Sequence, residues 1–282
     1  MPLDAQRLLS IDMLPRSVAY GDREAMLYAL AVGLGRTGGD SDLRFVYEDG
    51  LAVVPSFATV LAFDDSWLAD AGIDLAHVVH GALDIAFEQP FAPAGAVDVA
   101  FRIAGLSDKG AGKGGLVHQE TILSQNGAAA CTVLSSLFVR GGGGFGGSVG
   151  RDIPSERLPD RTADDSVVVE TRLEQALLFR LLGDRNPLHA DPAIARASSF
   201  DRPILHGACT FGIACATVLR RFCALDPARL GRFAARFAGP LYPGETLGFS
   251  FWIDGDRIGF RAVAVERGAI VLDNGLAIVR EA

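Results

Sequence analysis

The sequence predicts an α+β fold made of two similar halves, each with an antiparallel sheet. An order of signals occurs twice: a His-Gly pair, a proline-containing turn and a final strand-like run, which ends at Arg140 in the first half and at Arg280 in the second. Residues 208–219 are apolar almost all round, which is typical of a helix that a sheet covers on most sides. These observations predict a duplicated unit of sheet and helix.

Three strand-like segments close each half. They are rich in Val, Ile, Phe and Thr, and turn dipeptides such as Asn126-Gly127 and Asp254-Gly255 separate them. We expect strands at residues 98–105, 114–123 and 128–139, and again at 246–254, 257–266 and 269–280. Each set is expected to form its own antiparallel sheet, so the fold class contains two sheets.

The two halves differ in the interval that follows the His-Gly pair. From Gly207 to Pro240 there are 33 positions, but from Gly81 to the matching Pro90 there are only 9. Nine residues span about 13 Å even when all of them are helical. We therefore expect a full central helix in the C-terminal repeat and a truncated one in the N-terminal repeat.

A change of composition divides the chain into two domains. The run GGGGFGGSVG is followed by polar, proline-containing sequence, which is typical of a linker. We place the N-terminal repeat at residues 1–140, the linker at 141–165 and the C-terminal repeat at 166–282. The glycines of the run match G-x-G-x-x-G, but no helix-forming segment follows them, so we do not expect a dinucleotide site.

Composition excludes several classes of protein. The chain has 282 residues, 49% of them hydrophobic, and a mean hydropathy of +0.27, which is typical of a globular protein. Its formal charge is -8 and no basic patch is visible, so we expect no nucleic-acid partner. We expect no membrane span either, and without an N-terminal secretory signal the predicted location is cytoplasmic. Most of the four cysteines lie in the apolar helical segment and are expected to be buried and inert.

The segment GDRNPLHADP at residues 183–192 is the strongest candidate for chemistry. Asp184 and His189 supply a carboxylate and an imidazole, and the Gly, Asn and Pro between and before them predict a loop. Asn186 would brace the turn through its side chain. Asp191 is expected to cap the next helix, because Pro192 follows it at the first helical position.

A second candidate feature is the start of the apolar helix. Gly207 lies where the chain enters the helix, and the unpaired N–H groups of a helix start are suited to a developing negative charge. Close packing of helix on sheet would explain the glycine equally well. His206 is either a second acid or base or a hydrogen-bonded structural residue.

Other motifs lead to no site. His77 with His80, and His206 with Cys209, have spacings typical of metal ligands, but no second ligand pair completes a zinc shell. No serine nucleophile elbow and no phosphate-binding loop is present. We therefore expect no metal and no cofactor.

The segment LLGDRNPLHADPAIARASSFDRPILHGACTFGIA closely resembles the signature of the MaoC-like, (R)-specific 2-enoyl-CoA hydratases, the hydratase 2 family. Further segments that resemble this family, such as GLAVVPSFATVLA, FVRGGGGFGG and FAGPLYPGETL, extend over most of the chain. The resemblance implies a double hotdog fold, an acyl-CoA thioester substrate and a possible homodimer. It implies a reaction in which water adds reversibly to a trans-2-enoyl-CoA to give the (3R)-hydroxyacyl-CoA.

The same resemblance assigns roles to residues. Asp184 and His189 would be the catalytic pair, and Gly207 would donate to the thioester oxygen. The residues expected to bind the substrate are Asn186, His206 and Ala208. Coenzyme A would be part of the substrate, and no other cofactor would be needed.

The sequence also departs from the family pattern. Phe179 and Leu182 stand where the family usually has Tyr and Ser, and Ala82 stands where many two-repeat members have Glu. Asp84 lies two residues further on, but its spacing gives no reason to assign it the role of the Glu. We expect long or bulky acyl chains to occupy the space of the missing helix. The alternatives are a branched, dicarboxylic or sterol-derived acyl thioester, an acyl carrier protein thioester, a non-catalytic acyl-thioester-binding subunit and a thioesterase.

Overall fold

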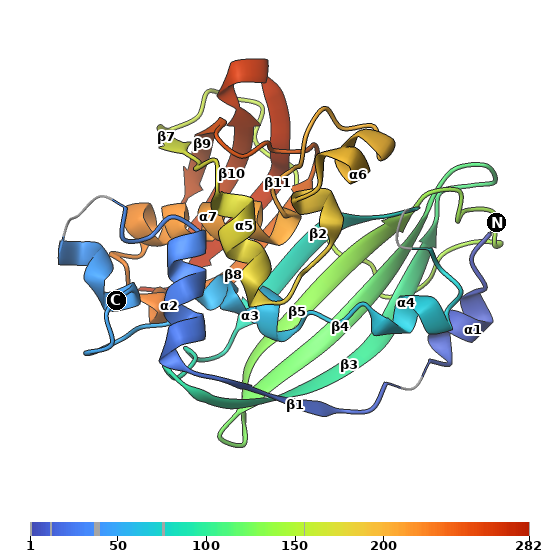
Figure 1. Cartoon of the computed structure of the whole chain (residues 1–282), viewed down its shortest axis with the longest axis horizontal. Coiled ribbons are helices and arrows are strands. Elements are labelled where there is room, and N and C mark those ends of the chain that lie inside the picture. Colours follow the sequence, from blue (N-terminus) through green and yellow to red (C-terminus); the bar gives the residue numbers. More distant parts are fainter. Residues whose placement is uncertain (1, 12, 37–39, 75–76, 155, 282) are drawn as a thin grey trace.

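The computed structural model describes residues 2–11, 13–36, 40–74, 77–154 and 156–281. Within them the chain forms one antiparallel sheet with short helices and one long helix (Figure 1). None of the described helices is long and apolar enough to cross a membrane.

The sheet contains eleven strands among the described residues. They are β1 (Arg16–Tyr20), β2 (Val78–Phe87), β3 (Gly95–Asp108), β4 (Gly115–Gln125), β5 (Ala128–Val139), β6 (Val149–Gly150), β7 (Asp165–Glu170), β8 (Leu230–Phe237), β9 (Thr246–Asp254), β10 (Arg257–Ala264) and β11 (Ala269–Val279). Their order is β1-β3-β4-β5-β2-β8-β11-β10-β9-β7, and β6 pairs with β3. The six strands expected from the sequence are therefore present, as β3 to β5 and β9 to β11.

The expectation of two separate sheets is wrong. β2 pairs with β8 from Ala82 opposite Arg236 to Ala86 opposite Arg232, and this pairing joins the two halves. Each strand would otherwise end its half of the sheet with a row of unpaired backbone groups, so the pairing satisfies both edges. From this seam outward, the halves run in the same order, β2-β5-β4-β3-β1 and β8-β11-β10-β9-β7.

The helices differ greatly in length. They are α1 (Ala5–Leu9), α2 (Asp22–Ala31), α3 (Ala58–Leu61), α4 (Ser66–Asp70), α5 (Gln175–Phe179), α6 (Pro192–Ala197) and α7 (Gly207–Phe222). The 3-10 turns are η1 (Asp40–Phe45), η2 (Pro55–Phe57), η4 (Arg180–Leu182), η5 (Pro187–His189), η6 (Pro227–Arg229) and η7 (Val265–Arg267). The expected long helix of the C-terminal repeat is α7, and it is buried along nearly all of its length.

The matching of the two His-Gly pairs is also wrong. His206 and Gly207 stand at the start of α7, but His80 and Gly81 lie inside β2. By its place in the sheet, β2 corresponds to β8 rather than to α7. The short helices α3 and α4 precede β2 and occupy the place in the chain order that α7 has before β8. In the N-terminal repeat only the short helices α3 and α4 therefore hold this place, and they lie outside the interval in which we expected the truncated helix.

Two clusters of buried apolar side chains cover the inner face of the sheet, which we define as the face that carries α3, α4 and α7. The larger cluster joins α7 to strands of both halves and includes Phe211, Phe233 and Ile85. The smaller one surrounds Trp67 of α4 and includes Leu137 of β5. In Figure 1, α3 and α4 cross the broad strands of the first half.

The glycine-rich run has a structural role. The carboxylate of Asp108 accepts hydrogen bonds from the backbone N–H groups of Gly110 at 2.8 Å, Gly144 at 2.7 Å, Gly146 at 3.0 Å and Gly147 at 3.3 Å. Successive N–H groups in such a turn form an anion-binding nest. Here an aspartate of the same chain fills the nest. The run leads into β6, not into a helix.

Candidate active site

The loop between α5 and α7 carries the candidate catalytic residues. Gly183 ends η4 with a φ of 132°, a conformation that favours glycine. The Asn186 side chain then accepts from the Leu188 N–H at 3.0 Å and starts the short turn η5. Asp191 caps α6, as expected, by accepting from the Ala193 N–H at 2.7 Å. These local bonds fix the irregular segment between the two helices.

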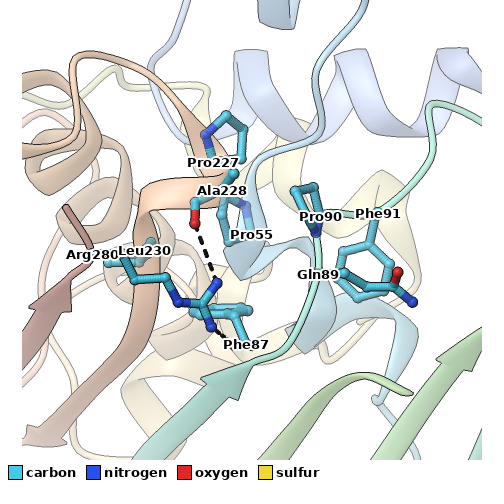
Figure 2. Close-up of a pocket in the computed structure, with 9 residues that line it drawn as sticks. All are labelled: Pro55, Phe87, Gln89, Pro90, Phe91, Pro227, Ala228, Leu230 and Arg280. Atoms are coloured by element: carbon cyan, nitrogen blue, oxygen red, sulfur yellow. Dashed lines mark hydrogen bonds between the residues drawn. The ribbon is translucent and has the colours of Figure 1, made fainter. Parts of the chain in front are cut away.

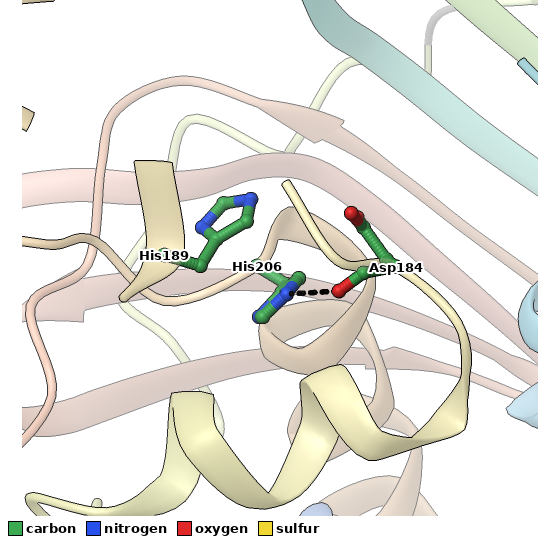
Figure 3. A group of neighbouring side chains, drawn as sticks. All are labelled: Asp184, His189 and His206. Atoms are coloured by element: carbon green, nitrogen blue, oxygen red, sulfur yellow. Dashed lines mark hydrogen bonds between the residues drawn. The ribbon is translucent and has the colours of Figure 1, made fainter. Parts of the chain in front are cut away.

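Asp184, His189 and His206 come together in this loop. One side-chain oxygen or nitrogen from each residue lies within 4.8 Å of the corresponding atoms of the other two. Figure 3 shows the Asp184 carboxylate and the His189 ring on the same side of the His206 ring, above it in the view. The Asp184 carboxylate also accepts from the Asn186 N–H at 3.1 Å, which orients it. The site therefore presents a half-buried carboxylate next to a buried imidazole.

The hydrogen bond of His189 decides which of its nitrogens can act as a base. Nδ1 lies 2.9 Å from the backbone carbonyl oxygen of Ile204, so Nδ1 carries the proton and donates it. Nε2 is then left with a lone pair. Burial lowers the pKa of His189, and the nearby Asp184 only partly opposes this. The ring is therefore neutral at pH 7 and able to accept a proton.

His206 packs against His189 from within the protein. Their rings are stacked, with centroids 3.7 Å apart, and Phe179 contacts the His206 ring at a centroid distance of 5.0 Å. Nε2 of His206 donates to the Asp184 backbone carbonyl at 3.3 Å. Burial, followed by the neighbouring His189, lowers the pKa of His206 to about 3. His206 therefore holds both catalytic candidates in place as a neutral ring.

The start of α7 borders the same site. The first described backbone bond of the helix runs from the Thr210 N–H to the His206 carbonyl at 3.0 Å, so the N–H groups of Gly207 and Ala208 have no partner within the helix. Both residues are partly exposed. A Cβ on Gly207 would lie 3.3 Å from the Phe237 ring, so glycine allows close packing there. The helix start can donate to an oxygen that gains charge.

The structure adds His80, which the sequence indicated only as part of the repeated His-Gly pair and of a rejected metal pair. Its pKa is lowered by the surrounding protein, and the charge of Asp184 acts in the opposite direction, so His80 lies near the catalytic loop. Its ring is 6.0 Å from that of Phe237. Its side chain is exposed to solvent. The N-terminal repeat thus contributes to the site.

A β-bulge directs His80 toward this site. The register of β2 against β5 shifts between His80, which lies opposite Leu137, and Ala82, which lies opposite Ser136. Residues directly opposite each other share a face, so His80 points to the inner face with Leu137, whereas Ala82 points to the other face. Gly81 in an otherwise regular strand pattern was the sequence signal for this bulge.

Asp84 does not take part in the site. Its buried carboxylate forms a two-bond ion pair with Arg232 of β8, at 2.9 and 2.7 Å. Like Ala82, Asp84 points away from the inner face. The missing glutamate at position 82 therefore removes no group from the Asp184 and His189 pair.

A small hollow lies at the far end of the seam between β2 and β8 (Figure 2). It has a volume of about 10 Å³ and is lined by residues of both repeats, among them Phe87, Pro227 and Arg280. Arg280 donates to the backbone carbonyls of Phe87 and Ala228. Phe87 is roughly 24 Å along β2 from His80. This hollow belongs to the joint between the repeats and not to the catalytic loop.

Comparison with known proteins identifies the family. Residues 154–274 match the MaoC-like domain, and residues 18–141 match the MFE-2 hydratase 2 N-terminal domain. The chain is 34% identical over 287 residues to the enoyl-CoA hydratase ChsH3 of Mycobacterium tuberculosis, with 99% of each chain covered. The chain belongs to the MaoC-like hydratase 2 family. It is also 33% identical to the peroxisomal enoyl-CoA hydratase 2 of Arabidopsis thaliana, with 94% of this chain and 92% of that protein covered.

Solved structures of other proteins have the same fold. A MaoC-like dehydratase from Phytophthora capsici superposes with a TM-score of 0.89 at 28% identity and covers 99% of this chain and 98% of its own. A Mycobacterium tuberculosis protein described as a double hotdog superposes with a TM-score of 0.58 at 18% identity, with 94% and 93% covered. The double hotdog expected from the sequence is thus confirmed, with its two halves joined in one sheet.

The predicted site residues fall into two groups. Asp184, His189, His206 and Gly207 surround one site, with Ala208 in the same first turn of α7. Asn186 is exposed, and its side-chain oxygen is used in the turn. Catalysis and substrate binding by these residues stay predictions. The cytoplasmic location and the homodimer stay predictions too, and the Arabidopsis relative is named peroxisomal.

Proposed function

We propose that this protein is an (R)-specific 2-enoyl-CoA hydratase, which also dehydrates (3R)-hydroxyacyl-CoA, with Asp184 and His189 as its acid and base. The observation that carries the proposal is the hydrogen bond from His189 Nδ1 to Ile204, which leaves Nε2 as an acceptor beside the Asp184 carboxylate. A water molecule held between these two groups would be positioned and deprotonated as it attacks.

The proposed reaction conserves all atoms of the added water. The water oxygen forms a bond to C3 while the electrons of the C2–C3 double bond move toward C2 and the thioester oxygen. One proton of the water passes to the pair formed by Asp184 and His189, and the pair delivers a proton to C2. The pair ends in its starting protonation state, so the reaction runs in either direction without a metal or redox cofactor.

The start of α7 would stabilise the enolate oxygen of the thioester. The N–H groups of Gly207 and Ala208 have no partner within the helix, and the positive end of the helix dipole lies at the same place. Donors that are already in position are effective because they need no rearrangement as charge develops. The stacked His206 would keep the distance between this helix start and His189 fixed.

The relatives support the acyl-thioester substrate. Besides the hydratases above, a protein named 3-hydroxyacyl-thioester dehydratase Y from Mycobacterium tuberculosis is 36% identical, with 93% of each chain covered. Its name leaves open whether the carrier of the acyl group is coenzyme A. We propose coenzyme A as the carrier, because the hydratase relatives named above are enoyl-CoA hydratases.

We further propose that the acyl chain lies along the inner face of the N-terminal repeat. The helices there, α3 and α4, have four and five residues, whereas α7 has sixteen. His80 lies on this inner face and near Asp184, so a substrate bound at the catalytic loop can extend past it. An apolar chain is a suitable occupant for a surface of this kind.

One assay tests the proposal. The pure protein is incubated with crotonyl-CoA and with a long-chain trans-2-enoyl-CoA while the absorbance of the conjugated enoyl group is followed. We expect loss of this absorbance, no release of free thiol, and a product that a (3S)-specific dehydrogenase does not oxidise. Release of free thiol would identify a thioesterase, and unchanged absorbance with both substrates would favour a non-catalytic acyl-thioester-binding subunit.

A further inference from the structure

Among the described residues of the N-terminal repeat, three buried side-chain nitrogens lack a hydrogen-bond partner, and one of them, Nδ1 of His118, lies on the other face of β4 with Ser136. The other two are hydrogen-bond donors. They are Nε1 of Trp67 in α4 and Nε2 of Gln119 in β4, and neither has a hydrogen-bond partner among the described residues. Trp67 is 1% exposed and Gln119 is 7% exposed. Buried donors in native proteins are nearly always paired with protein or with water, so two unpaired donors in one region require an explanation.

Both donors lie on the same side of the sheet. Gln119 lies opposite Ile103 of β3 and opposite Ser135 of β5, and paired residues share a face. Ile103 packs in the cluster around Trp67, whose ring lies 6.3 Å from that of Phe101, a diagonal neighbour of Gln119. The indole of Trp67 and the amide of Gln119 therefore lie on the same face of the sheet, and both adjoin the stretch of β3 that contains Phe101 and Ile103.

This region lies on the path that we propose for the acyl chain. His80 stands opposite Leu137, and Gln119 stands opposite Ser135, two residues further along β5. Two strand spacings and this offset separate Gln119 from His80 by roughly 12 Å, about the length of an extended ten-carbon chain. A group bound by Gln119 would thus lie near the far end of a medium-length acyl chain.

We propose that Gln119 and Trp67 form a specificity site for an uncharged oxygen, a keto or hydroxyl group, carried by the acyl chain far from the thioester. The inference rests on the proposed function, because it extends the substrate of the same site. Two donors that lack an acceptor match an oxygen that has lone pairs.

The residues around Gln119 on the inner face are uncharged, which favours a neutral group over a carboxylate. The described inner-face residues of β4 and β5 near Gln119 are Val117, Thr121, Val133, Ser135 and Leu137, and none of them carries a charge. A carboxylate without a cation would be costly to bury there, whereas a keto or hydroxyl oxygen would lose little more than its bonds to water. A dicarboxylic acyl group is therefore excluded from this site by the proposal.

The test compares three substrates of equal chain length: trans-2-dodecenoyl-CoA and its ω-hydroxy and ω-carboxy forms. We expect wild-type protein to have its highest kcat/KM with the ω-hydroxy form. Gln119→Met removes the amide donor at similar volume, and Trp67→Phe removes the indole donor. Each should lower the ratio of kcat/KM for the ω-hydroxy form over the plain form by roughly fivefold to tenfold, the value of one hydrogen bond.

The matched control is Thr121→Val, which removes a hydroxyl from the next inner-face position of the same strand. It should leave the substrate ratio unchanged, and thermal unfolding of every variant reports on folding. If Gln119→Met does not fold, Trp67→Phe still decides the question. An unchanged ratio in the donor variants, as expected if a trapped water pairs the two donors, overturns the proposal, and so does a preference for the ω-carboxy form.

A binding measurement separates this inference from the proposed function. Titration calorimetry with dodecanoyl-CoA and ω-hydroxydodecanoyl-CoA needs no turnover. Tighter binding of the ω-hydroxy form that is lost in Gln119→Met supports the site even if no hydration is found. Hydration of dodecenoyl-CoA without any preference for the hydroxyl overturns the site and leaves the proposed function intact.

Discussion

His189 is bound through Nδ1 to the backbone carbonyl of Ile204 at 2.9 Å, three residues before the start of α7. This bond ties the proposed base to the chain that leads into α7, whose first N–H groups are the proposed oxyanion donors. The base and the expected oxyanion donors are therefore fixed by one short stretch of backbone. Replacing the side chain of Asp184 or of His189 should therefore lower the reaction rate far more than the stability of the fold.

Replacing Asp184 or His189, the proposed catalytic pair, tests this arrangement. Asp184→Asn and His189→Gln should each lower kcat by roughly a hundredfold to ten-thousandfold, which is the usual contribution of acid and base assistance. Asn at 184 can still accept from the Asn186 N–H, so thermal unfolding should change little. The loss of absorbance of the conjugated enoyl group measures the rates of the variants.

The matched control for this pair is Asp191→Asn, a carboxylate of the same segment that only caps α6. Asn caps helices about as well as Asp, so both rate and stability should be retained. Near-normal rates in either catalytic variant would contradict the assigned mechanism.

The buried His206 should make the stability of the protein depend on pH. Its folded pKa of about 3 is below the ordinary value of 6.5, so between these values the unfolded chain binds the proton more readily than the folded one. Stability should therefore be fully present above pH 6.5 and should fall with decreasing pH, by up to about 1.4 kcal/mol per pH unit from this group. Denaturant unfolding from pH 7 to pH 4 measures the slope.

Substitution separates the contribution of His206 to this pH dependence of stability from the contributions of the other histidines. His206→Gln should be less stable at pH 7, because it loses the stacking on His189, but its stability should fall less steeply with acid. His77→Gln changes an exposed histidine and should leave the slope unchanged. An identical slope in wild type and His206→Gln would show that His206 is not the buried neutral ring described above.

Asp108 provides a test of the glycine-rich run. Its backbone hydrogen bonds, the one from Gly144 first, lower its pKa to about 2. The folded pKa is depressed, so this stabilisation should be present above pH 4 and disappear as the pH falls toward 2. Asp108→Asn should thus unfold at a lower temperature than wild type at pH 7, and the difference should shrink below pH 4. Asp201→Asn, at an exposed position, should show no such difference.

The ion pair between Asp84 and Arg232 tests the seam of the two repeats. Its carboxylate is buried, so Asp84→Asn should reduce the free energy of unfolding by about 2–4 kcal/mol, because an uncompensated guanidinium remains. The double variant Asp84→Leu with Arg232→Met should recover part of this loss. Urea unfolding measures both, and a double variant less stable than the single one would show that the pair itself stabilises the seam.

The sequence predicted what depends on local patterns. Alternating residues and turn dipeptides located the strands from β3 to β5 and from β9 to β11, and the apolar run located α7. The loop with Asp184 and His189 was predictable because Gly183 and Pro187 exclude a regular helix. The catalytic roles of the two residues remain to be tested by the variants above.

What depends on distant pairing was not predictable from these patterns. The pairing of β2 with β8 joins residues about 150 positions apart, and no local signal chooses the partner of an edge strand. The bulge at Gly81 moves His80 to the inner face, which reverses the orientation that strict alternation would give. Trp67 likewise reaches the inner face, on which Gln119 lies, only through the packing of α4 on the sheet.

The last prediction concerns the length of the acyl chain. If the chain lies on the inner face of the N-terminal repeat, each added methylene leaves water and contributes about 0.8 kcal/mol, so kcat/KM should rise over several carbons above the four-carbon substrate. A series of trans-2-enoyl-CoA substrates from four to sixteen carbons, with one sterol-side-chain thioester, measures this rise. Ser135→Phe places a ring on the proposed path at a partly exposed position of β5, so it should lower kcat/KM for long chains and leave crotonyl-CoA as the internal control. A steady fall from four carbons onward in wild type would instead mean that apolar side chains already fill the space above the sheet, since close packing is the rule in protein interiors.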